Sequence, residues 1–117
     1  MAIQESLEKM KVIQSSILDY LENDVANQED FGILKDLFQQ NNIKGSKNEL
    51  KLFLYLLIKI SNNHQRSFNF FNKIEFILQY IKTELKQYFS NLEIFNIFKS
   101  NKRILLILIE ENLLMFD

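Results

Sequence analysis

The sequence predicts an all-α fold of about six antiparallel helices, and three observations support this. Apolar residues recur at spacings of three and four almost throughout, which is the period of an amphipathic helix. The chain has no proline and only two glycines, fewer turn-forming residues than β-rich folds usually need. No segment alternates strictly between apolar and polar residues over the length of a strand. Two architectures fit this pattern: a helical bundle and a short α-solenoid of stacked helical hairpins.

The first two expected helices lie on either side of a polar stretch at residues 23–30. The first spans about residues 3–22, where the apolar side chains form a single stripe. The second opens at Asn27 or Gln28, with acidic residues favourable in its first turn, and ends near Asn41 and Asn42. Gly45 falls in the connection that follows.

The third and fourth helices are expected to form the centre of the fold. Ser46 and Glu49 match a capping box, in which a serine and a glutamate satisfy the free N–H groups of a helix start. The helix that begins there and continues to about residue 60 is apolar on nearly all sides, which predicts a central position. A polar connection at 61–67 leads to a fourth helix over about residues 69–88.

Two short helices are expected to complete the chain. Ser90 and Glu93 form a second capping box, which starts the fifth helix. Ser100 is a candidate cap for the sixth, which spans about residues 101–112 and contains the dense apolar run 104–109.

Composition and charge exclude several classes of protein. At 117 residues we expect a single domain, residues 1–117. Without cysteine there is no disulfide framework, thiolate nucleophile or zinc finger, and the net charge of −1 provides no positive field for nucleic acid. The longest apolar run has six residues, against roughly 20 for a membrane span, and charges within the first twenty residues leave no signal peptide. We therefore expect an intracellular, cytoplasmic protein that does not enter a membrane.

No pattern in the sequence predicts catalysis, a metal site or a cofactor. His64 is the only histidine, so a metal site would lack partner ligands, and we interpret it as a loop residue near a helix end. Glu110 and Glu111 are adjacent on a helix and point about 100° apart, so they do not form a paired acid–base site. The sequence predicts a protein that is not an enzyme.

Lys99, Lys102 and Arg103 form the densest basic cluster and are candidate partner-binding residues. Lys102 and Arg103 fall in the first turn of the expected sixth helix, and Glu110 and Glu111 in its last. Both placements oppose the helix dipole, at a cost of about 0.3–1 kcal/mol each. Either the basic residues pair with carboxylates on another helix, or they form an exposed edge that meets an acidic partner.

The apolar residues that follow the sixth helix are the second set of candidate partner-binding residues. They are Leu113, Leu114, Met115 and Phe116. The terminal element of a solenoid should present a polar outer face, and this one is apolar. Either the helix lies in the middle of the bundle, or the apolar end is a docking face for further helical repeats or for another subunit, including a second copy of the chain.

Three stretches resemble a helical domain of unknown function that precedes the repeats in protist ankyrin-repeat proteins. They are NLEIFNIFKSNKRILL at 91–106, ISNNH at 60–64 and FFNKIE at 70–75. The similarity covers about residues 15–114, although the T-P-L-H-x-A pattern of ankyrin repeats is absent. The chain would then be either the isolated N-terminal domain of a longer protein or a naturally short member of the family.

The resemblance implies a role in protein–protein interaction. The sequence hypothesis is a non-enzymatic interaction or scaffold module that binds a protein partner or further helical repeats. The alternative is a structural subunit of a larger assembly, such as a cytoskeletal lattice.

Overall fold

The computed structural model describes the backbone of residues 2–22, 28–63 and 70–115, and the side chains of residues 8–22, 32, 34–63 and 70–115. All regular structure in these ranges is helical, so the predicted all-α class is confirmed. The elements are α1 (Ala2–Glu22), α2 (Gln28–Gln40), the 3₁₀ turn η1 (Ile43–Gly45), α3 (Lys47–Asn63), α4 (Phe70–Tyr80), α5 (Lys82–Tyr88), α6 (Asn91–Phe98) and α7 (Lys102–Glu110).

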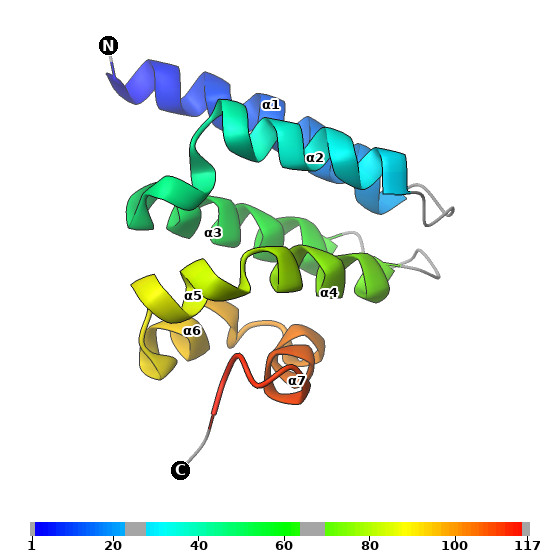
Figure 1. The fold of residues 1–117 in the computed structure, drawn as a ribbon, viewed down its shortest axis with the longest axis vertical. Helices are drawn as coiled ribbons and strands as arrows, with labels where there is room; N and C mark the ends of the chain where they lie inside the picture. The colour runs from blue at the N-terminus through cyan, green and yellow to red at the C-terminus, as the bar shows by residue number, and fades with distance from the viewer. Residues whose placement is uncertain (1, 23–27, 64–69, 116–117) are drawn as a thin grey trace.

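The helices form three layers stacked along the longest dimension of the molecule, and the two helices of each of the first two layers run antiparallel (Figure 1). The first layer contains α1 and α2, the second α3 and α4, and the third α6 and α7. Helix α1 packs on α3 and α4 of the second layer, and these pack in turn on α6 and α7. The fold is therefore a helical bundle built from stacked hairpins, with α7 in the layer farthest from α1.

The middle layer contains the centre of the core. This is expected because its first helix is apolar on nearly all sides. Helix α3 buries residues on several sides of its circumference, and one hydrophobic core runs through the three layers. Phe38 of α2 joins the first layer to the second. Its ring packs edge-on against Phe53 at 4.7 Å and stacks on Tyr80 at 5.3 Å between centroids.

Two of the expected helix starts, those of α3 and α6, carry the capping serines that the sequence places there, and Asn27 lies outside the described residues. The Ser90 box is complete: its hydroxyl accepts from the Glu93 N–H at 3.2 Å, and the Glu93 carboxylate accepts from the Ser90 N–H at 3.1 Å. At α3, the Ser46 hydroxyl accepts from the Glu49 N–H at 3.5 Å. The Glu49 carboxylate there pairs with Lys9 of α1 at 3.0 Å, which joins two layers.

The short connection between α2 and α3 turns at Asn42. This residue lies between the end of α2 and the start of η1 and adopts the left-handed conformation, with φ of 51°. A Cβ atom added to Gly45 would meet the side-chain amide of Asn42, so a larger residue there would require this exposed amide to rotate away.

Two expected boundaries in the middle layer are wrong. Helix α3 runs on to Asn63 rather than ending near residue 60. Its extension places Ser61 in the core, where the hydroxyl donates to the Leu57 carbonyl at 2.7 Å and so satisfies its own hydrogen bonding.

The helix expected at 69–88 is divided into α4 and α5 at Ile81, so the structure has seven α-helices in its described part rather than six. Ile81 has a ψ of 12°, which departs from helical geometry. Neither proline nor glycine marks the break. The buried positions Ile77, Ile81 and Leu85 keep helical spacing across it, so periodicity alone could not reveal it.

Candidate interaction surface

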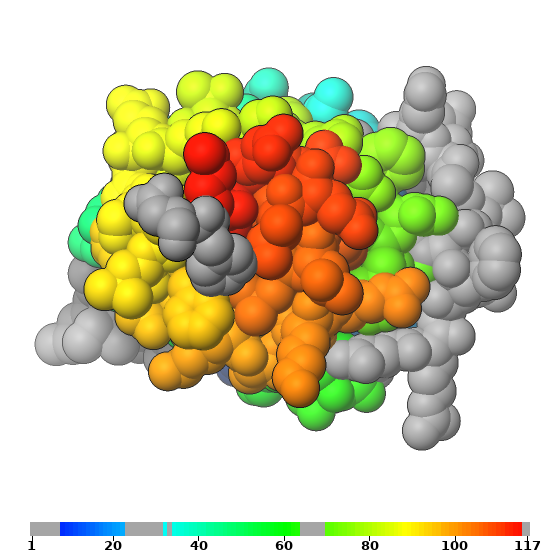
Figure 2. All heavy atoms as spheres, turned by 90° about the horizontal axis from the view of Figure 1, so that it is seen from below, coloured from blue at the N-terminus to red at the C-terminus, as the bar shows by residue number. Residues whose placement is uncertain are grey.

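Helices α6 and α7 and the residues after α7 form one end of the stack (Figure 2). Helix α7 buries Ile104 and Leu108 and turns the opposite side outward. Leu106 lies at the centre of that outward side and is 55% exposed, and Ile109 is 38% exposed. Helix α7 therefore does not lie in the middle of the bundle, and it presents apolar surface at the end of the fold.

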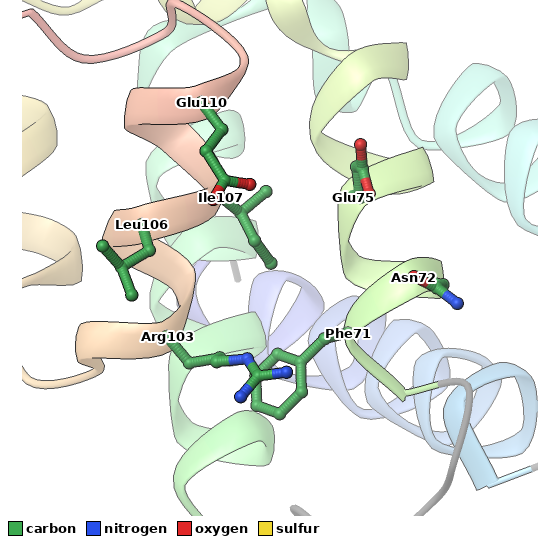
Figure 3. A pocket seen from close by; sticks show the side chains of 7 residues that line it. All are labelled: Phe71, Asn72, Glu75, Arg103, Leu106, Ile107 and Glu110. Atoms are coloured by element: carbon green, nitrogen blue, oxygen red, sulfur yellow. The ribbon is translucent and has the colours of Figure 1, made fainter.

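The basic cluster lies at the N-terminal end of this outward side. Lys99, Lys102 and Arg103 are all exposed. Within the part of the chain that the structure describes, none of them forms an ion pair with a carboxylate. Arg103 instead lies over the ring of Phe71 of α4, 4.9 Å from the centroid (Figure 3). The expected pairing with another helix is thus absent there, and the basic edge is open.

A groove with a volume of about 300 Å³ separates α7 from α4 beside the outward side. Its lining residues are Phe71, Asn72, Glu75, Arg103, Leu106, Ile107 and Glu110. Figure 3 shows Arg103 and Phe71 at one end, with Glu110 and Ile107 directed into the space between the helices. The groove therefore combines an apolar wall with a cation at one end and carboxylates at the other.

Carboxylates gather at the C-terminal end of α7, opposite the basic cluster. Glu111 accepts a hydrogen bond from the Gln79 amide of α4 at 3.2 Å. A hydrogen bond shared with Glu111, followed by desolvation and the charges of Glu111 and Glu110, raises the pKa of Glu75. The same hydrogen bond, together with that from Gln79, lowers the pKa of Glu111. Glu75 of α4 and Glu111 after α7 therefore lie close enough for the charge of each to affect the pKa of the other.

The apolar residues after α7 divide between core and surface. Leu113 and Leu114 are 2% exposed, so they belong to the core, and the expectation that they line an exposed docking face is corrected. Met115 is 59% exposed and stays a candidate. Phe116 lies outside the described residues.

The burial of these two leucines follows from how α7 ends. Asn112 adopts the left-handed conformation with φ of 59°. The N–H of Leu113 then bonds to the carbonyl of Leu108 at 2.8 Å, and that of Asn112 to Ile109 at 3.1 Å. This is a Schellman motif, which reverses the chain and brings the residue after the turn against the last helical turn. The helix therefore stops at Glu110 rather than near residue 112.

The start of α7 is fixed by Asn101, not by Ser100 as the sequence predicts. The side-chain oxygen of Asn101 accepts from the Ile104 N–H at 3.1 Å, and the side-chain amide of Asn101 donates to the side-chain oxygen of Asn62 at the end of α3, also at 3.1 Å. Asn101 is buried and Ser100 is exposed. One side chain thus caps α7 and ties it to the middle layer, which orients the outward side.

The described residues also bear on the question of a metal site and of a membrane-spanning helix. His64 lies outside them. Among the described side chains, no three His, Cys, Asp or Glu residues are arranged to hold a metal ion. No helix in that part of the chain is long and apolar enough to cross a membrane.

Comparison with known proteins adds no relative to this description. No protein-family model matches the sequence, and neither the curated proteins nor the solved structures yield a match.

Proposed function

We propose that this chain is a non-enzymatic protein–protein interaction or scaffold module, and that it binds its partner through the outward side of α7. The observation that carries the proposal is the exposure of Leu106 and Ile109 at the end of the stack. An end layer that faced only water would be expected to be polar there. An apolar strip flanked by charges is typical of a surface that binds another protein.

The rest of the third layer supports this role. Lys102 and Glu110 continue the strip at either end, and both are exposed. Met115 and Leu92 add large exposed apolar side chains to the same layer. Helix α7 is held by the Asn101 cap, so the strip is a rigid surface that needs no ordering before it binds.

The resemblance to the helical domain that precedes ankyrin repeats is consistent with an intracellular interaction module. The stretches that carry the resemblance include residues that hold the scaffold. Asn62 bonds to Asn101, and Lys73 donates to the Tyr20 carbonyl. These two contacts serve the fold, so the resemblance concerns structure and suggests a binding role only by analogy.

Affinity capture with matched variants tests the proposal. Leu106→Glu should abolish capture of partner proteins that the wild-type chain retains from extracts of its source cells. Leu52→Glu is the control, because Leu52 is 45% exposed on α3 of the middle layer. Both variants should keep the helical circular dichroism signal. Equal capture by the two variants would refute the proposal.

The alternative is a structural subunit of a larger assembly, such as a cytoskeletal lattice. Val12 of α1 favours it, because this large apolar side chain is 57% exposed in the first layer, at the other end of the stack. Association through both ends would produce open chains of growing size. Sedimentation velocity would show this as species that enlarge steadily with concentration and that Val12→Glu shortens.

A further inference from the structure

We infer that the outward side of α7 binds a second copy of the chain, with the two α7 helices packed antiparallel about a two-fold axis. The inference rests on the proposed function and names the partner. It is argued from the order of charges along one exposed strip and from the area available at the end of the stack.

The exposed strip of α7 is complementary to itself when reversed. Lys102, Leu106 and Glu110 follow one another at intervals of four residues, and all three are exposed. They therefore lie one helical turn apart, with a cation first, an apolar residue in the middle and an anion last. In an antiparallel pair centred on Leu106, Lys102 of each copy meets Glu110 of the other. The two copies of Leu106 meet at the axis.

The same pairing relieves an electrostatic conflict within α7. Lys102 lies in the first turn of the helix and Glu110 in the last, so each charge opposes the dipole of its own helix. In an antiparallel pair, the Lys102 ammonium lies beside the C-terminal end of the other α7. Glu110 likewise lies beside the other N-terminal end. Each charge then meets a favourable dipole as well as an opposite charge.

Charged residues beside the strip have the same arrangement as the strip itself, with cations at one end and anions at the other. Lys99 and Arg103 add positive charge at the Lys102 end. Glu111 and Glu75 add negative charge at the Glu110 end, where repulsion from Glu110 and Glu111 contributes to the raised pKa of Glu75. A second copy in the reversed orientation brings its basic end to this acidic end, twice per dimer.

The width of the molecule sets an upper bound on the interface. The molecule measures 34 × 23 Å at its widest across the axis of stacking, and the third layer occupies only part of that width (Figure 1). A standard protein interface buries about 800 Å² on each partner, so a dimer through this layer is expected to be of the smaller, concentration-dependent kind. An interface that uses one patch on both copies closes on itself, so the expected product is a dimer and not a filament.

Charge reversal in two separate variants tests the pairing. Lys102→Glu alone places two acidic residues opposite each other, and Glu110→Lys alone places two basic residues opposite each other. Each variant should dissociate at concentrations at least about tenfold higher than wild type does. An equimolar mixture of the two should restore the dimer, because every cross-copy pair is again opposite in charge. The chain carrying both reversals should dimerise with itself.

Analytical ultracentrifugation over a range of concentrations provides the readout, with light scattering for the mass. Wild type should form dimers that higher salt weakens, and Leu106→Glu should sediment as a monomer at concentrations where Leu52→Glu is dimeric. The charge reversals suit the dipole of α7, so at concentrations where the wild type is also monomeric neither variant should melt at a lower temperature than the wild type. Misfolding is thereby separated from loss of the interface.

Two results would overturn the inference. One is a wild-type chain that stays monomeric up to about 500 µM, a concentration at which even weak specific dimers form. The other is a mixture of the two reversed variants that stays monomeric although each is folded. If Leu106→Glu still loses a different protein in affinity capture, the proposed function stands and only the second copy is the wrong partner.

Discussion

The side-chain nitrogen of Lys73 donates a hydrogen bond to the main-chain carbonyl of Tyr20 at 2.7 Å, in the interior of the protein. Lys73 is completely buried, and its nitrogen lies 5.1 Å from the centroid of the Tyr20 ring. The Tyr20 carbonyl belongs to the last turn of α1, where the helix dipole favours a positive charge. A lysine of the middle layer thus satisfies a carbonyl group in the last turn of a helix in the first layer.

Loss of this lysine should destabilise the protein strongly. Lys73→Ala removes a buried hydrogen bond and leaves a cavity where the side-chain stem packs. We expect a loss of about 2–4 kcal/mol in the free energy of unfolding. Urea denaturation followed by circular dichroism measures it. Lys59→Ala, at an exposed position of α3, should change stability by less than about 0.5 kcal/mol. Similar small losses for both variants would show that the buried contact contributes little.

Much of the helical framework is predictable from the sequence because its determinants are local. The amphipathic spacing over residues 3–22 gives α1, and a serine–glutamate box gives the start of α6. Burial of Lys73 has no such local signal, since its acceptor lies 53 residues earlier in the chain. The break between α4 and α5 at Ile81 also has no signal in the sequence, because the buried positions keep their helical spacing across it.

The candidate surface is predictable only in part. The sequence leaves two outcomes open for Lys102 and Arg103, pairing with carboxylates on another helix or an exposed basic edge, and both residues are exposed in the structure. The burial of Leu113 depends on the left-handed backbone of Asn112, and the helical pattern of the preceding run extends to this residue without a glycine to mark the turn. The pairing of Glu75 with Glu111 joins two helices, so no spacing rule within one helix reveals it.

Two substitutions of Asn101 distinguish the contributions of its two hydrogen bonds to stability. Asn101→Ala should cost about 1–2 kcal/mol, because it removes the cap of α7 and the tie to Asn62. Asn101→Asp keeps an oxygen for the Ile104 N–H but cannot donate to Asn62, so it should recover part of the loss. Ser100→Ala, at the exposed neighbouring position, should have an effect below about 0.5 kcal/mol. Chemical denaturation of the three variants gives the ranking, and a larger loss for Ser100→Ala would contradict the assignment of the cap.

The stability of variants at Asn112 should depend on how readily the new residue adopts the left-handed conformation of the turn after α7. Asn112→Gly should leave stability unchanged or raise it, because glycine adopts the left-handed region without strain. Asn112→Ala should lose about 1 kcal/mol, and Asn112→Val more, because a branched side chain is poorly tolerated at positive φ. Thermal unfolding orders the three variants. Equal stability of Asn112→Gly and Asn112→Val would show that the turn does not hold Leu113 in the core.

Titration of the acidic end should show two carboxyl groups displaced in opposite directions. Glu75 should titrate above the ordinary pKa of 4.5, because its carboxyl donates to Glu111, and Glu111 should titrate below it. The contribution of Glu75 to stability is present below pH 4.5 and is lost as the pH rises through its raised pKa. That of Glu111 is present above pH 4.5 and is lost as the pH falls through its lowered pKa. The pair should therefore favour the folded state most when it holds one proton.

Carbon-detected NMR of the side-chain carboxyl groups measures these pKa values, and Glu111→Gln tests their cause. Without the second charge, the pKa of Glu75 should fall back toward 4.5. Glu93 is the internal control. Its pKa is lowered by the hydrogen bond with Lys47, a contact of 2.8 Å between α3 and α6, and should be the same in both proteins. A Glu75 carboxyl that already titrates near 4.5 in the wild-type chain, or that does not respond to Glu111→Gln, would mean that α4 and α7 do not share a proton.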